Sequence, residues 1–90
     1  MNKAELVNRV AEQTKSTKVQ TEKIIDATIT TIRNQVADGS DVKLVGFGTF
    51  TKTERKARRG HNPQTGAEIE IPGGWYPKFR PGTEFKKILK

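Results

Sequence analysis

The chain has 90 residues, with 17 Lys and Arg against 10 Asp and Glu, a net charge of +7, a single His and no Cys. This length suffices for one domain, expected over 1–90. The absence of Cys excludes disulfides and thiolate-bound metal centres, and one His leaves no histidine cluster for a transition metal. Leu, Ile, Val and Phe supply only 20 of the 90 residues. A core built from one copy would be thin, so we expect the chain to self-associate.

The positive charge is concentrated in the second half of the chain. Residues 1–40 carry 6 basic and 5 acidic side chains, whereas residues 41–90 carry 11 and 5. A basic surface attracts polyanions, so we expect nucleic acid as the partner, with a generally basic, solvated surface as the alternative. The N-terminus lacks an apolar signal-peptide core, and the missing Cys fits a reducing compartment. We therefore expect a cytoplasmic location and no membrane partner.

The first 40 residues predict a helical hairpin. Asn2, with Glu5 three residues later, forms a variant of the capping box, which predicts a short helix over about 3–13. A second helix is predicted over about 18–38. It ends at Gly39, because glycine suits a left-handed C-terminal cap.

The second helix carries a broad apolar face. Its members recur at helical spacing: Ile24, Ile25, Ile29, Ile32 and Val36. This face is wide for so short a chain and needs another surface to cover it. A second copy of the chain could provide that surface, and the alternative is a helix packed only on its own sheet.

After the second helix the apolar period changes to two, which predicts a sheet over about 41–82. The alternation begins at Val42, and a glycine-framed turn at 46–48 joins two strands. These glycines do not form a nucleotide cradle, because a strand and not a helix follows them. Phe47 and Phe50 are assigned to the core and interface in preference to base stacking.

A basic ribbon is predicted within this sheet, as an arm over about 52–74. One strand continues from 51 to 61, a turn follows at 62–66, and a second strand returns over 67–72. The outgoing strand is basic with almost nothing apolar, so the ribbon cannot bury a face of its own and should project. A lone two-stranded ribbon is marginal in water, so we expect the arm to be mobile alone and ordered on its partner. Its reach of roughly 33 Å suffices to pass around a duplex.

The chain closes with a strand over about 73–82 and a helix over 83–90. Lysines such as Lys86 favour the end of that helix through its dipole and can meet phosphates. Trp75 and Tyr76 stay open between packing at the base of the arm and contact with nucleic acid.

Five motifs in this second half carry a family resemblance. They are Gly-Phe-Gly-Thr-Phe at 46–50, Ala-Arg-Arg-Gly at 57–60, Asn-Pro-Gln-Thr-Gly at 62–66, Glu-Ile-Glu-Ile-Pro at 68–72 and Phe-Arg-Pro-Gly at 79–82. Together they resemble the bacterial HU/IHF family of histone-like DNA-binding proteins. The similarity covers the whole chain without gaps, and the arm-tip motif is its most specific part.

The resemblance implies an α+β fold and an intertwined dimer. It has a helical base, a β-sheet saddle and two protruding β-ribbon arms that embrace DNA through the minor groove. In that family the proline at the arm tip wedges between base pairs, and by position this proline is Pro63. The implied function is architectural: largely sequence-non-specific binding of duplex DNA, with bending and compaction. The alternatives are a sequence-preferring IHF-like or phage-type DNA-bending protein and an RNA-binding basic protein.

The residues expected to contact DNA combine the polar side chains of the arm with cations elsewhere. They are Lys3, Lys52, Arg55, Lys56, Arg58, Arg59, His61, Asn62, Pro63, Gln64, Arg80 and Lys86. Arginine's planar fork suits acceptors at several base pairs alike, which permits tight binding with little sequence preference. Pro63 taken by itself would be read as a plain turn proline, and Asn62 and Gln64 stay open between turn residues and base contacts.

The dimer interface is expected to join the second helix to the aromatic part of the sheet. Its residues are Ile29, Ile32, Val36, Leu44, Phe47, Phe50 and Phe79. The expected partners are a second copy or a heterodimer partner, and double-stranded DNA that is nicked, gapped or bent by preference. The expected location is the nucleoid in the bacterial cytoplasm, whether a chromosome or a phage encodes the chain. No cofactor and no enzyme activity are expected, because the composition offers no nucleophile with a base.

Three features depart from the family pattern. His61 stands where a basic residue is usual, and a largely neutral histidine would weaken one contact near the tip or make it pH-dependent. Thr83 stands where Lys is common, and the segment 73–76 replaces a more polar stretch with a flexible, aromatic one. These features bear on the body-side phosphate contacts and on the hinge of the arm, not on the fold.

Overall fold

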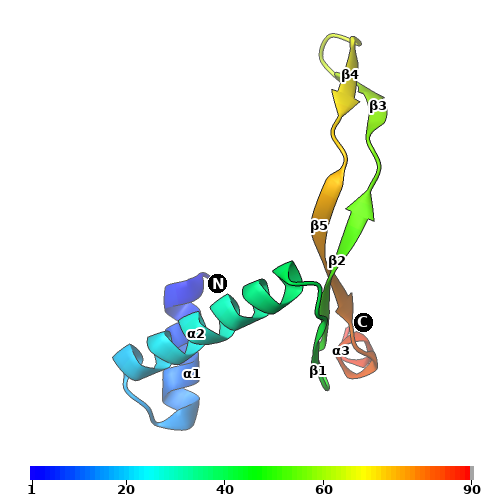
Figure 1. Ribbon diagram of the computed structural model, residues 1–90. Helices are drawn as coiled ribbons and strands as arrows, with labels where there is room; N and C mark the ends of the chain where they lie inside the picture. Colours follow the sequence, from blue (N-terminus) through cyan, green and yellow to red (C-terminus); the bar gives the residue numbers. More distant parts are fainter. Residues whose placement is uncertain (90) are drawn as a thin grey trace. The chain divides into compact units, whose positions relative to one another are not determined.

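The computed structural model describes residues 1–89, in which helices α1 and α2 come first, the strands follow and the short helix α3 comes last (Figure 1). In chain order the elements are α1 (Lys3–Thr14), α2 (Lys18–Ala37), β1 (Val42–Leu44), β2 (Gly48–Arg55), β3 (Arg58–His61), β4 (Glu68–Ile71), β5 (Gly74–Pro81) and α3 (Thr83–Lys87). The α+β class predicted from the sequence is confirmed. Backbone contacts divide the chain into two compact units, Met1–Asn34 and Gln35–Lys90. The expected single domain stays a prediction.

The first helix begins at the capping residue that the sequence predicted. The side-chain oxygen of Asn2 accepts a hydrogen bond from the Glu5 amide at 2.9 Å, which satisfies one of the free N–H groups at the start of α1. Both helices agree with the predicted ranges to within one residue at either end. Val7 and Ala11 of α1 are buried, and Thr21 of α2 is the buried polar residue of this unit.

The isoleucine face of α2 lies largely open in the single chain. Ile24 is 61% exposed and Ile29 is 44% exposed, while Ile25, Ile32 and Val36 are half-buried. An apolar face of this width costs free energy in water unless another surface covers it.

The second unit is built on a three-stranded antiparallel sheet in the order β1-β2-β5. The predicted glycine-framed turn joins β1 to β2, and Gly46 has a φ of +86°, which favours glycine. Gly48 is required for a different reason. A Cβ there would lie 2.5 Å from both the Arg80 carbonyl oxygen and the Phe79 ring, so only a residue without a side chain lets β5 approach.

An aromatic cluster lies on this sheet and α3. The cluster consists of Phe47, Phe50, Phe79 and Phe85, whose ring centroids lie 4.9 to 6.3 Å apart in the contacting pairs. Such tilted and stacked pairs stabilise a core. Among the described residues of this unit, 35–89, Gly48 alone is buried, and Phe47 remains 43% exposed. The cluster is therefore only partly shielded from solvent in the single chain.

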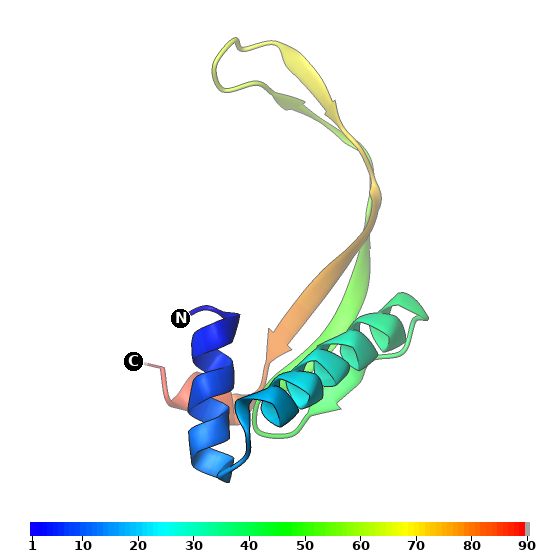
Figure 2. The ribbon, with the colours of Figure 1, turned by 90° about the vertical axis from the view of Figure 1, so that its left-hand side faces the viewer.

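Beyond the sheet, β2 and β5 continue as a two-stranded ribbon, and β3 and β4 form its outer part; Figure 2 shows this ribbon curving toward its tip. The strand predicted to run unbroken from 51 to 61 is interrupted at Lys56 and Ala57. The register is unchanged across the gap, since Arg55 pairs with Gly74 and Arg58 with Ile71. Pro72 lies opposite the gap and has no N–H to donate to the ladder, which explains the interruption.

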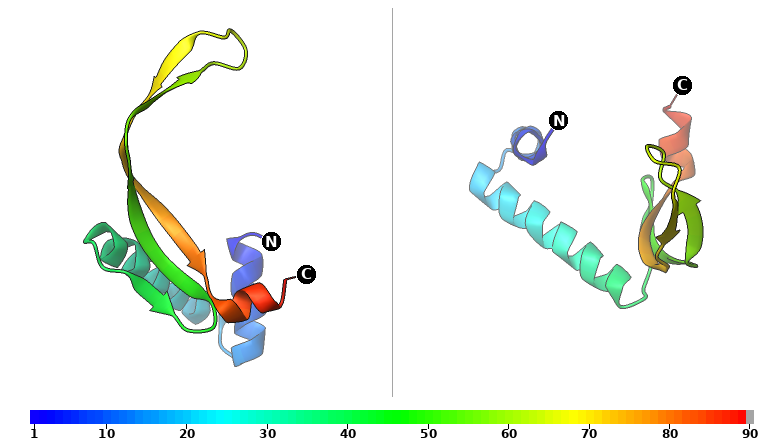
Figure 3. Two further views of the ribbon diagram at one scale, coloured as in Figure 1. Left: turned by 90° about the vertical axis from the view of Figure 1, so that its right-hand side faces the viewer. Right: turned by 90° about the horizontal axis from the view of Figure 1, so that it is seen from above.

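The last helix is shorter than predicted. It follows β5 directly (Figure 3) and ends at Lys87, not at 90, and Ile88 forms its C-cap. Lys90 lies outside the described residues. Since α3 has only five residues, packing of Phe85 and not helix propensity holds it.

Candidate nucleic-acid interface

The arm tip is a tight turn built by Asn62. The Asn62 amide donates to the Ala67 carbonyl oxygen at 2.8 Å, and its own carbonyl oxygen accepts from the Gly66 amide at 2.7 Å. Its side-chain oxygen accepts from the Gln64 amide at 2.9 Å. Asn62 is therefore a turn residue whose side-chain oxygen is occupied, and its expected contact with DNA stays a prediction. Pro63 is exposed at this tip.

The two faces of the outer arm differ in charge. Register places Arg59 and His61 opposite Glu70 and Glu68, and Arg59 forms an ion pair with Glu68 at 3.6 Å. The other face carries Arg58 with Gly60 and the two isoleucines Ile69 and Ile71. The predicted row of arm cations is thus divided between a mixed-charge face and a face that is basic and apolar.

A cleft of about 500 Å³ lies where the ladder is interrupted. It is lined by Arg55, Lys56, Arg58, Ile71, Pro72 and Tyr76. Arg55 lies over the Tyr76 ring, 4.9 Å from its centroid, and the Tyr76 hydroxyl donates to the Pro72 carbonyl oxygen at 3.1 Å. Three of the predicted contact residues therefore converge on one cleft with no carboxylate in its lining.

The base of the ribbon, where residues 52–55 pair with 74–77, is the arm root. Two contacts orient Lys52 there. The Lys52 ammonium lies 4.7 Å from the centroid of the Trp75 ring and donates a hydrogen bond to the Ala37 carbonyl oxygen at 3.1 Å. The rings of Tyr76 and Trp75 each contact a cation at the arm root. Each residue therefore contributes to packing at the base of the arm, which is the first of the two roles considered for them.

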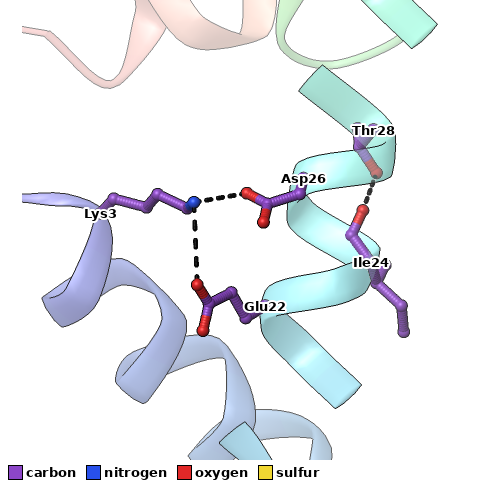
Figure 4. Close-up of polar contacts among 5 residues, drawn as sticks. All are labelled: Lys3, Glu22, Ile24, Asp26 and Thr28. Carbon is purple, nitrogen blue, oxygen red and sulfur yellow. Dashed lines mark hydrogen bonds and ion pairs between the residues drawn. The ribbon is translucent and has the colours of Figure 1, made fainter. Parts of the chain in front are cut away.

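Lys3, in the first unit, is already paired with acids (Figure 4). Its ammonium lies 2.5 Å from a carboxylate oxygen of Asp26 and 3.9 Å from one of Glu22. The hydrogen bond to Asp26 raises the pKa of Lys3 above its usual value. A phosphate that binds Lys3 would have to compete with these carboxylates.

Besides the cations of the arm and Lys3, a further group of cations lies on the polar face of the sheet. Arg80 pairs with Thr49, and the same register puts Lys43 and Lys78 on that face. Lys43 and Lys78 were not among the predicted contact residues, although the period-two pattern placed them on the side opposite the phenylalanines. Lys86, which was predicted, is exposed in the last turn of α3.

Other kinds of site find little support in the described residues. Within 1–89 no three His, Cys, Asp or Glu side chains gather as a metal site would require. In the same part of the chain, no helix combines the length and apolarity needed to cross a membrane.

Comparisons with known proteins agree with this geometry. The family model described as "Bacterial DNA-binding protein" matches residues 1–90. DNA-binding protein HU-1 of Halalkalibacterium halodurans is 49% identical over 89 residues, which are 99% of each chain. DNA-binding protein HU of Staphylococcus aureus is 47% identical over 90 residues, covering both chains fully.

A solved structure gives the same result for the fold. The HU protein in an Anabaena HU–DNA cocrystal structure superposes with a TM-score of 0.88 at 46% identity, covering 97% of this chain and 95% of its own. Since family model, relatives and fold agree along the whole length, the chain belongs to the bacterial DNA-binding protein family, that of the HU proteins.

Proposed function

We propose that this chain binds duplex DNA as an architectural protein that bends and compacts it. The observation that carries the proposal is the arm, where Arg55, Lys56 and Arg58 converge on a carboxylate-free cleft and the tip presents an exposed Pro63. The cocrystal of the Anabaena relative with DNA supports the same function.

The arm is suited to the minor groove. That groove offers similar acceptors at A·T and T·A pairs, so cations that enter it bind with little sequence preference. The face with Arg58, Ile69 and Ile71 combines charge with apolar contact and is the one we assign to the groove floor. Pro63 then acts as a rigid wedge between base pairs, and Arg59, His61 and Gln64 meet the backbone or base edges beside it.

Cations outside the arm extend the contact. Arg80 and Lys86 are exposed and supply phosphate contacts on the body, and Lys3 joins them when a phosphate displaces its carboxylate partners. Nicked, gapped or bent duplexes are expected to bind best, because they are cheaper to deform.

The functional unit that we propose is an intertwined dimer. The isoleucine face of α2 and the half-buried aromatic cluster are two apolar surfaces that one chain leaves open. A second copy would bury both, and it would add a second arm so that a duplex is held from two sides. The interface residues are those predicted: Ile29, Ile32, Val36, Leu44, Phe47, Phe50 and Phe79.

The proposed role is binding, not catalysis, and we place it on nucleoid DNA in the bacterial cytoplasm. RNA is a weaker ligand on this proposal, because the wide, shallow minor groove of A-form RNA does not accept such an arm in the same way.

Footprinting combined with a bend-angle measurement on random and structured duplexes tests the function. Similar affinity across unrelated sequences, tighter binding to nicked or gapped DNA and a large bend are expected. Protection of one chosen site would instead indicate a sequence-preferring protein, and equal binding to duplex RNA would contradict the minor-groove mechanism.

A further inference from the structure

Lys52 differs from the other arm cations because its ammonium has two partners within the chain. It is half-buried, whereas Arg55, Lys56, Arg58 and Arg59 are exposed. Its Nζ donates to the Ala37 carbonyl oxygen at 3.1 Å and lies 4.7 Å from the centre of the Trp75 ring. All three residues belong to the same compact unit. A side chain held in this way is poorly placed to follow a phosphate.

The carbonyl group that accepts the hydrogen bond from Lys52 lies at the carboxyl end of α2. Ala37 is the last residue of α2, and the final four carbonyl groups of a helix have no partner in the helix itself. Cations stabilise this end through the helix dipole, yet the last turn of α2 contains no basic residue. Lys52 reaches it from β2 and supplies the missing positive charge.

Trp75 completes the arrangement from the opposite strand. It pairs with Glu54, two residues along the ladder from Lys52 and on the same face, and a side chain at this diagonal distance can cover its neighbour. The indole is 60% exposed, so it is not held by burial in the chain. Its contact with the Lys52 ammonium, 4.7 Å from the ring centroid, is an interaction that orients it.

We propose that Lys52 and Trp75 form a brace that fixes the arm root to the carboxyl end of α2, and that Lys52 is a positioning residue and not a phosphate contact. On the other face of the ribbon, Tyr76 holds Arg55 and is anchored at Pro72. The arm root is therefore restrained on both faces, whereas the outer arm has the Arg59–Glu68 ion pair on one face. A root ordered in advance lowers the entropy lost when the arm closes on DNA. The effect on DNA affinity rests on the function proposed above.

The brace itself is tested on the free protein. Trp75 is the only tryptophan, so the emission of the full-length chain reports this side chain alone. Lys52→Met removes the charge over the ring and should shift the emission and lower its anisotropy, and Lys52→Arg should restore both. Arg58→Met is the matched control and should leave both unchanged. Identical emission and anisotropy in wild type and Lys52→Met would overturn the proposal.

The positioning role is tested by the salt dependence of duplex binding. Each phosphate contact contributes about one unit to the slope of log affinity against log salt, so Arg58→Met should lower the slope by about one. Lys52→Met should weaken binding about three- to tenfold at every salt concentration with the slope unchanged. Loss of a full unit of slope in Lys52→Met, or no change in affinity, would overturn the proposal.

A second variant tests the proposal if Lys52→Met does not fold. If Lys52→Met fails to melt cooperatively, Trp75→Leu replaces it, because it removes the other half of the brace and keeps the charge. It should weaken binding to the same extent with an unchanged slope, and wild-type slope and affinity would overturn the proposal. If the wild-type chain binds no duplex at all, the proposed function fails, while the fluorescence measurement still decides whether the brace exists.

Discussion

The helical unit, Met1–Asn34, and the arm differ in whether they contain buried side chains. In the helical unit Val7, Ala11 and Thr21 are buried against neighbours, and each helix starts at a capping residue. In the arm, residues 52–77, no described residue is buried. Both regions leave isoleucines exposed, since Ile69 of the arm and Ile29 of α2 are each 44% exposed. The contrast teaches that stability and binding are separated along the chain. Changes of apolar side chains in the helices should alter folding, and changes in the arm should alter contact with DNA.

The largest effect is expected on folding, for a change in the helical unit. Ile32→Asp would place a carboxylate in the interface proposed for the dimer, where burying an unpaired charge is strongly unfavourable. The variant should lose cooperative folding at micromolar concentration, measured by circular dichroism during heating. The melting temperature of the wild type should rise with protein concentration, as mass action requires of an obligate dimer.

The matched control for this variant lies on the arm. Ile69→Asp is the same chemical change at an apolar residue outside the predicted interface, and it should leave the melting temperature within a few degrees of wild type. A folded, concentration-independent monomer, or equal destabilisation by both variants, would contradict the separation of stability from binding.

The next largest effect concerns the charge of the arm. If about six phosphates are neutralised, affinity should fall roughly a thousandfold between about 50 and 200 mM monovalent salt. Arg58→Ala should reduce the salt slope by about one unit without changing sequence preference, as measured by titration of a labelled duplex. Arg33→Ala, on α2, serves as the control and should keep the wild-type slope. Binding that is insensitive to salt would mean that the arm is only a solvated surface.

A change at the arm tip should lower the affinity for duplex DNA only a little but reduce the bend angle of the DNA strongly. A wedge between base pairs costs a few kcal/mol of stacking, which is recovered because the bent duplex meets more of the protein. Pro63→Ala should therefore keep most of the affinity for unbent duplex but reduce the bend angle, measured by energy transfer between the duplex ends at saturation.

The preference for nicked or gapped DNA should shrink together with the bend in Pro63→Ala. Gln64→Ala removes a polar contact beside the wedge but not the wedge itself, so at saturation it is the control and should bend DNA like wild type. Equal bend angles for Pro63→Ala and wild type would make Pro63 a turn residue only.

The smallest effect is expected at Lys3. Asp26→Asn removes the main partner of Lys3 and frees its ammonium for phosphate, so DNA affinity at low salt should rise by less than about threefold. Glu12→Gln, an exposed acid of α1, is the control. Unchanged affinity and an unchanged salt slope in Asp26→Asn would remove Lys3 from the contact set.

The pH dependence of this pair has a definite sign. Because the carboxylates raise the pKa of Lys3, the pair stabilises the fold below the ordinary pKa of lysine, and this stabilisation is lost as pH rises through the raised value. Asp26→Asn should flatten the stability curve in that alkaline range.

The sequence by itself determined the elements and the chemistry of the arm. Capping at Asn2, the left-handed Gly39 and the change of period after it depend on neighbours in sequence, so local physics was enough to place them. The motifs also sufficed for the family, which the comparisons confirm. The break of the long strand was missed, although Pro72 carried the signal, because the donor it lacks matters only once its partner strand is known.

Only the tertiary structure decided what each cation does. Lys3, Lys52 and Arg58 are alike in sequence as basic residues near others of their kind. One is paired with carboxylates, one is bound to a helix end and an indole, and one borders a cleft without acids. These differences come from residues distant in the chain, brought close by strand register and helix packing, and no local pattern encodes such distances. The sequence supplied the charge, and the fold determined which charges remain available to a partner.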